Sequence, residues 1–148
     1  MSEPSVSSSD RRFVTLAERI VEPTVFTSNE WMSRPDVVPC RELLLVRATM
    51  EAGRSHPFHC HPTREEIIYV ISGRAEQWCG TEYRILGPGE MVLIPKGEVH
   101  GTYNPYSEPL VFLAILSPSE APGPDVVDRA GETPWLGLRE RNHLPPCE

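Results

Sequence analysis

Two histidines and a glutamate stand close together in the stretch HPFHCHPTREE, with a spacing that suits a metal site. If the stretch begins in a β-strand, His59 and His61 point to the same face, and Cys60 between them points to the other. The segment PTR contains a proline, which a central strand does not tolerate, so the chain is expected to turn there. Glu66 then opens the next strand with Glu65 on its opposite face. Only Glu66 of the two carboxylates can therefore join the histidines.

A third imidazole is expected from His100, which follows a turn set by Pro95 and Gly97 in the segment IPKGEVH. Three neutral imidazoles and one carboxylate suit a first-row transition metal. Four ligands leave positions open on a six-coordinate metal, and open positions are typical of catalytic rather than structural sites. The sequence therefore predicts one divalent transition metal per chain, which can be Fe, Mn, Ni, Cu or Zn.

The bulk composition excludes several classes of partner. The chain has 148 residues, of which 39% are hydrophobic and 24% charged, as expected for one globular domain. Its net charge of −7 disfavours nucleic acid and anionic membranes as partners. No apolar stretch reaches the roughly 18 residues that a membrane span needs, and the start lacks the pattern of a secretory signal. The four cysteines form no CxxC pair, so free thiols and a cytoplasmic location are expected.

Many chain-breaking residues, 16 prolines and 10 glycines, favour short strands over long helices. Turn signals recur every eight to twelve residues or so, which is typical of an all-β sandwich or barrel. Strands are expected within residues 40–53, 65–78, 81–104 and 109–118. The last of these is the most apolar and is expected to be fully buried, and Cys79–Gly80 is expected to form a hairpin turn.

The ends of the chain are expected to differ from the middle. Residues 1–12 are Ser-rich and are expected to be disordered, and residues 13–27 are expected to form an extended arm at the start of a 13–118 barrel domain. The Pro-rich extension 119–148 is expected to dock on the barrel through Trp135 and Leu136.

Two longer patterns in the sequence resemble the motifs of the cupins. The first motif is a glycine, five residues, HxH, three or four residues, a glutamate, six residues and a glycine. Here it reads GRSHPFHCHPTREEIIYVISG, from Gly53 to Gly73. The second is a glycine, five residues, PxG, two residues, a histidine, three residues and an asparagine, and here it reads GEMVLIPKGEVHGTYN, from Gly89 to Asn104. Every fixed position of both motifs matches across a core of residues 40–118, which makes the resemblance far more specific than a lone HxH.

The resemblance implies a small single-domain cupin: an all-β, double-stranded β-helix or jelly-roll barrel with an N-terminal arm and a Pro-rich tail. It also implies that His59, His61, Glu66 and His100 are the metal ligands, with Glu66 as a catalytic residue that can leave the metal and act as a base. The implied function is a metal-dependent enzyme for a small oxygen-chelating substrate, in first place a dioxygenase. A non-redox isomerase, lyase or polyketide-type cyclase is the alternative, and a non-catalytic small-molecule-binding cupin is the third hypothesis.

Several side chains near these motifs could have either a chemical or a purely structural role. His56, Tyr69 and Tyr103 are candidate bases outside the ligand set, although Tyr69 is expected to face away from the site. We expect His56 to be an exposed loop residue, Cys60 to be a packing thiol and Asn104 to be a turn or strand-end residue.

The strand that begins at Glu66 also predicts an apolar outer surface. If Glu66 faces inward, Ile67, Tyr69 and Ile71 face outward and would expose a continuous apolar patch on an isolated barrel. Either the N-terminal arm or a second subunit must cover such a patch. A homodimer is expected, because two-fold dimers are the commonest oligomers.

Overall fold

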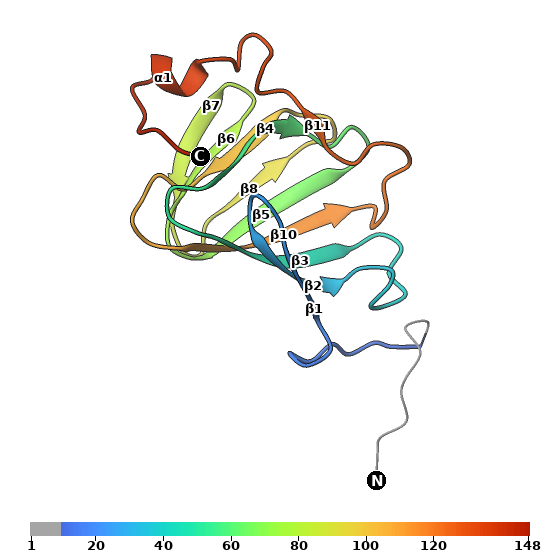
Figure 1. Ribbon diagram of the computed structural model, residues 1–148. Coiled ribbons are helices and arrows are strands. Elements are labelled where there is room, and N and C mark those ends of the chain that lie inside the picture. Colours follow the sequence, from blue (N-terminus) through green and yellow to red (C-terminus); the bar gives the residue numbers. More distant parts are fainter. Residues whose placement is uncertain (1–9) are drawn as a thin grey trace.

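The structure is a computed structural model that describes residues 10–148, so most of the predicted disorder at residues 1–12 lies outside the described residues. The chain forms two antiparallel sheets that face each other across the interior (Figure 1). The first sheet has the order β1 (Ile20–Pro23), β2 (Ser28–Ser33), β3 (Leu44–Met50), β10 (Leu110–Ser117), β5 (Glu65–Ser72) and β8 (Met91–Ile94). The second has the order β11 (Val127–Asp128), β4 (Ser55–Cys60), β9 (His100–Tyr103), β6 (Ala75–Cys79) and β7 (Glu82–Leu86), and a short helix α1 (Leu138–Arg141) follows near the C-terminus. This arrangement confirms the predicted all-β jelly-roll fold.

The main hydrophobic core lies on the inner face of the first sheet. Side chains alternate between buried and half-buried along β3 and β10, as the period of a strand requires. The buried set includes Leu44, Val46, Ala48, Met50, Ile68, Val70, Leu110, Phe112, Ala114 and Leu116. The prediction that residues 109–118 form a fully buried strand is wrong, because every second side chain of β10 points to the outer face of the sheet.

The second sheet has a polar inner face and an apolar outer face. His59 on β4 and His100 and Thr102 on β9 line the interior cavity. Phe58 and Tyr103, on the same two strands, belong to a second hydrophobic cluster on the outside. Strands β4 and β9 therefore direct polar side chains into the cavity and apolar side chains to the outer face of the sheet.

The C-terminal extension packs on this outer face (Figure 1). Trp135 contacts the second cluster, and its indole N–H donates to the carbonyl oxygen of Gly80 at 3.1 Å. The guanidinium of Arg139 donates to the carboxylate of Glu76 through two hydrogen bonds, of 2.7 Å from Nε and 2.8 Å from Nη2. The predicted docking of Leu136 is wrong, since this side chain is 60% exposed.

The N-terminal arm holds more regular structure than the sequence indicated. Strand β1 lies within the predicted arm of residues 13–27 and forms an antiparallel hairpin with β2, which follows the arm and pairs with β3, so the two strands extend one edge of the first sheet. Trp31 of β2 lies opposite Val46 and packs against the main core. This hairpin therefore forms part of the wall around the interior.

An apolar surface lies on the outer face of β5 and β8, at the other edge of the same sheet. Side chains along β5 alternate as predicted: the inward ones are Glu66, Ile68 and Val70, and the outward ones are Ile67, Tyr69 and Ile71. Met91 lies opposite Tyr69 and Leu93 lies opposite Ile67, and Met91 and Leu93 are 46% and 50% exposed. We call these five outward residues of β5 and β8 the outer apolar patch. The described part of the arm does not cover it, because β1 and β2 lie at the opposite edge.

Two turns show how the backbone is held. The β6–β7 hairpin turns at Gly80–Thr81, one residue later than predicted, because Cys79 still pairs with Glu82. Gly73 has a φ of +79°, and a Cβ there would collide with the carbonyl oxygen of Pro109. A glycine is therefore required between β5 and β6.

The cysteines agree with the expectation of free thiols, since none of the four forms a disulfide. Cys60 is buried in the second cluster, as predicted for a packing thiol, and Cys79 packs against the main core. No helix within residues 10–148 is long and apolar enough to cross a membrane.

Candidate metal centre

The three predicted histidine ligands come together on the second sheet. His59 lies on β4, His61 directly follows β4, and His100 opens β9 opposite His59. All three are buried, and their candidate ligand atoms lie within 4.8 Å of one another. The structure thus unites residues that are 41 positions apart in the sequence, from His59 to His100.

Each imidazole is fixed by a hydrogen bond from its Nδ1 atom to a backbone carbonyl. His59 donates to Pro57 at 2.6 Å, and His100 donates to Glu98 at 3.0 Å. His61 donates to the carbonyl of Asp125 at 2.9 Å. A carbonyl oxygen can only accept, so Nδ1 carries a proton, and each ring presents a lone pair at Nε2 when it is neutral. This is the usual way in which proteins orient metal-binding histidines.

The fourth predicted ligand, Glu66, lies beside two of the histidines. Its Oε1 atom is 2.9 Å from Nε2 of His100 and 3.6 Å from Nε2 of His61. Glu66 is buried and Glu65 is exposed, as predicted. Glu66 Oε1 and His100 Nε2 are both buried, yet neither has a hydrogen-bond partner of acceptable geometry among the described residues. Two buried ligand atoms without hydrogen bonds, beside two further imidazoles, fit a bound metal cation.

The electrostatics of the centre favour a carboxylate at Glu66 and a neutral imidazole at His59. Burial alone would raise the pKa of Glu66, but the neighbouring imidazoles of His100 and His61 outweigh burial and hold this pKa below its ordinary value. Burial holds the pKa of His59 well below its ordinary value. For His61, burial lowers the pKa, but the hydrogen bond to Asp125 and the charge of Glu66 outweigh burial and raise this pKa above its ordinary value. At neutral pH, Glu66 is therefore a carboxylate and His59 a neutral imidazole, as metal binding requires.

Asp125 positions His61 and was not found from the sequence. Besides the carbonyl that accepts the His61 hydrogen bond, its carboxylate Oδ1 lies 3.4 Å from His61 Nδ1 and accepts from Arg64 Nη1 at 2.6 Å. These donors hold the pKa of Asp125 at about 2, with His61 the main cause. Arg64 is itself buried and donates to the carbonyls of Pro118 and Ser119. The start of the C-terminal extension is therefore fastened to the metal centre.

His56 lies inside the site rather than on an exposed loop. It belongs to β4, where the pairing with β9 is irregular between His56 and His59, so both rings turn toward the cavity. The ring of His56 stacks between those of Phe26 and His59, with centroid distances of 4.2 and 3.6 Å. Burial lowers the pKa of His56 to about 4. The prediction of an exposed loop residue is wrong.

The other candidate bases lie away from the centre. Tyr69 is on the outer face of β5, as predicted. Tyr103 belongs to the outer cluster, and its hydroxyl accepts the backbone N–H of Phe58 at 3.1 Å. Asn104 is fully buried, and its amide donates to the carbonyls of Met50, Glu51 and Glu108, as expected for a residue that holds a strand end.

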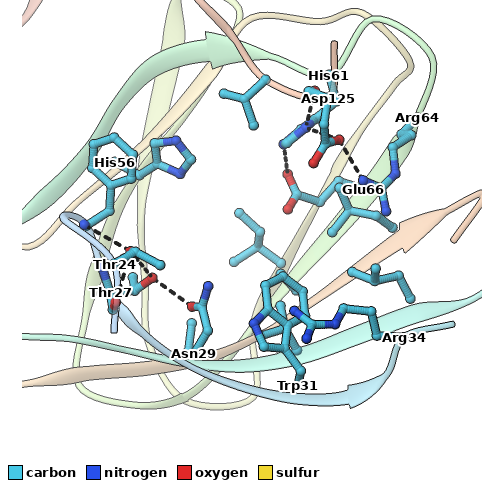
Figure 2. A pocket seen from close by; sticks show the side chains of 18 of the residues that line it. Thr24, Thr27, Asn29, Trp31, Arg34, His56, His61, Arg64, Glu66 and Asp125 are labelled. Carbon is cyan, nitrogen blue, oxygen red and sulfur yellow. Dashed lines mark hydrogen bonds and ion pairs between the residues drawn. The ribbon is translucent and has the colours of Figure 1, made fainter. Parts of the chain in front are cut away.

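A cavity of about 640 Å³ opens in front of the metal centre. Glu66 and His61 lie at one side of it, and Asn29, Trp31 and Arg34 lie at another (Figure 2). Its floor is apolar and comes from the main core, from Leu44, Val46, Ala48, Ile68, Phe112, Ala114 and Leu116. A space of this size suits a small organic ligand.

Comparisons with known proteins agree with the fold and the motifs. A sequence profile of the family described as the cupin domain matches residues 46–116. Dimethylsulfoniopropionate lyase DddQ from Ruegeria pomeroyi is 42% identical over 67 residues, which are 45% of this chain and 32% of that protein. Germin-like protein 3-8 from Oryza sativa is 31% identical over 106 residues, which are 66% of this chain and 41% of that protein. The chain therefore spans less than half the length of these two curated relatives.

Solved structures show the same architecture. The crystal structure of DddQ from Ruegeria pomeroyi matches with a TM-score of 0.64 at 26% identity, over 78% of this chain and 64% of that chain. The polyketide cyclase RemF from Streptomyces resistomycificus matches with a TM-score of 0.67 at 23% identity, over 86% of this chain and 91% of that chain. Residues 46–116 contain both motifs, and this match to the family profile, together with the shared fold, supports a small protein of the cupin superfamily.

Proposed function

We propose that the protein is a metal-dependent enzyme that acts on a small oxygen-chelating organic substrate. The observation that carries this proposal is the convergence of three oriented imidazoles and the Glu66 carboxylate at one end of an apolar cavity. When bound, a divalent metal at these ligands would supply a Lewis acid that polarises a substrate oxygen. The apolar floor would exclude water from the bound ligand.

The surroundings of the centre favour chemistry in which a proton moves. His56 lines the cavity with its ring against that of His59, and among residues 10–148 no hydrogen bond occupies its ring nitrogens. Because its pKa is about 4, His56 is neutral at physiological pH and can take a proton only from a substrate group whose own pKa a bound metal would lower. Glu66 is a second proton acceptor if it leaves the metal. The names of two similar proteins, a lyase and a polyketide cyclase, support a non-redox reaction of this kind.

Dioxygenase chemistry, the first expectation from the sequence, is the second candidate. Four protein ligands leave two positions of a six-coordinate metal for other groups, which is the feature that favours it. The two candidates differ in one measurable respect, because only a dioxygenase consumes oxygen.

The test uses metal-reconstituted protein with β-diketones, enediols and hydroxy-ketones, under air and under argon. Oxygen is followed with an electrode and products are followed by mass spectrometry. Turnover that is equal under both gases supports the non-redox reaction, and turnover with matching oxygen uptake supports the dioxygenase. Binding without turnover under any metal would contradict the enzyme proposal and leave the binding cupin.

The role of His56 has a variant that separates it from packing. His56→Phe keeps an aromatic ring between Phe26 and His59 but removes the nitrogens. We expect an unchanged metal content and a fall in turnover of about 10²- to 10⁴-fold, as for the loss of a general base. Unchanged turnover in this variant would show that His56 moves no proton.

A further inference from the structure

Strand β2 places two polar side chains in the cavity far from the metal centre. Asn29 and Trp31 both line the cavity, and Figure 2 shows them on the side away from Glu66 and His61. They lie two residues apart and therefore share the inward face of the strand. No ligand of the metal centre comes from this strand, so these side chains need an explanation of their own.

The indole N–H of Trp31 is a buried donor without an acceptor. Its Nε1 atom is shielded from solvent and has no hydrogen-bond partner within the described part of the chain. Buried donors are rarely left unpaired, because the lost hydration is not replaced. Because this donor is covered, a ligand in the cavity can supply its acceptor only if the indole turns toward the cavity.

The neighbours of Trp31 indicate which kind of acceptor fits. The carboxamide oxygen of Asn29 accepts from the Thr27 hydroxyl at 2.7 Å, which leaves the amide NH2 to donate to a ligand. The Arg34 guanidinium lies 4.6 Å from the Trp31 ring centroid, but it is paired with Asp36 through hydrogen bonds of 2.7 and 2.9 Å. Because that charge is already balanced, this end of the cavity favours a neutral oxygen over a carboxylate.

The floor between the two ends is apolar and spans four strands. Trp31 on β2 lies opposite Val46 on β3, and Val46 lies opposite Ala114 on β10. Ala114 in turn lies opposite Ile68 on β5, which is two residues from Glu66. Three strand spacings separate β2 from β5, which is about 14 Å along the sheet. The side chains of Trp31 and Glu66 reach into this gap, so a ligand between them lies over an apolar floor and against the polar inner face of the second sheet.

We propose that Asn29 and Trp31 form a second binding point, which selects a substrate with a neutral oxygen acceptor held away from its chelating oxygens by an apolar body. The chelation of a metal by one end of this ligand rests on the proposed function. The recognition of its far end depends only on the side chains of β2. Asn29 and Trp31 are then specificity-determining residues, and they take no part in the metal centre.

Two matched probes test the far end. The compounds 1,8-dihydroxyanthraquinone and 1,8-dihydroxy-9-anthrone share the same hydroxy-carbonyl chelating edge. They differ at the opposite ring position, which is a carbonyl in the quinone and a methylene in the anthrone. Dissociation constants are measured by equilibrium dialysis under argon with zinc-loaded protein, since zinc does not oxidise the anthrone.

Wild-type protein is expected to bind the quinone about two- to tenfold more tightly than the anthrone, the range for one neutral hydrogen bond. Trp31→Phe keeps an aromatic ring but removes the N–H, and it is expected to abolish this preference. Trp135→Phe, which removes an indole N–H outside the cavity, is expected to keep it. Asn29→Leu is a second variant that removes the other donor, in case Trp31→Phe does not fold.

Three results would overturn the proposal: no binding of either probe, equal binding of both by the wild type, or a preference that survives both Trp31→Phe and Asn29→Leu. His100→Ala reports separately on the proposed function, which requires both probes to bind more weakly once the metal is lost. A quinone preference that depends on Trp31 but not on the metal would support the second binding point and contradict the metal-dependent function.

Discussion

The buried ion pair between Arg139 and Glu76 gives the sharpest prediction about stability. Glu76 is fully buried, and its carboxylate accepts two hydrogen bonds from Arg139 and one from the Trp78 indole at 2.7 Å. The guanidinium also lies 4.4 Å from the ring centroid of Tyr103 and donates to the carbonyl of Pro145. Arg139→Ala removes the only positive charge that faces this carboxylate among the described contacts and leaves it with a single donor.

Breaking a buried pair from one side costs about 3–5 kcal/mol, because a charge stays in the interior without its partner. That is a large share of the ~5–15 kcal/mol by which a domain is stable. The free energy of unfolding is measured by urea denaturation, with circular dichroism as the probe. The double variant Arg139→Met with Glu76→Leu should lose less than Arg139→Ala alone, since no charge remains buried.

Arg129 provides the matched control, because it also makes two hydrogen bonds to one carboxylate, that of Glu132, but on the exposed surface. Arg129→Ala should change the stability little. Equal losses in Arg139→Ala and Arg129→Ala would refute the reasoning, since burial would then not decide the contribution of the pair.

Two further predictions concern the metal centre and the surface. Asp125→Ala should weaken metal binding about tenfold, because the carboxylate near His61 is lost but the backbone carbonyl that holds His61 remains. This is the lower end of the usual effect of removing a group that orients a metal ligand. Metal affinity is measured by competition with a chelator, and an equal loss of affinity in Asp128→Ala would contradict the prediction. We also propose that two copies of the chain associate through the outer apolar patch. Light scattering at micromolar concentration should show a dimer for the wild type and a monomer for Leu93→Glu, whereas a monomeric wild type would contradict the proposal.

The parts of the site that are local in sequence could be predicted from it. His59, His61 and Glu66 lie within eight residues, so strand alternation and one turn suffice to place them on one face. His100 is distant, and only the spacing of the second motif linked it to the others. The inward and outward faces of β5 followed from the same alternation.

The parts of the site that depend on distant contacts could not be predicted. Asp125 is 64 residues from His61 and lies in a Pro-rich segment, where no periodicity indicates which side chain turns inward. Trp31 and Asn29 belong to a hairpin whose place at the edge of β3 is set by pairing across the sheet, and sequence spacing does not encode that pairing. The irregular pairing within β4 that turns His56 inward has no local signal either, because a strand without it would direct His56 and His59 to opposite faces.

The central claim is that this cupin holds a metal at His59, His61, Glu66 and His100. The most direct test is the metal content of the protein, purified without oxygen and without chelating resin and measured by elemental mass spectrometry, with His100→Ala as the comparison. We predict about one transition-metal ion per wild-type chain and its loss in a variant that keeps the same circular dichroism spectrum. No metal in the wild type even after reconstitution, or full occupancy in His100→Ala, would contradict the account.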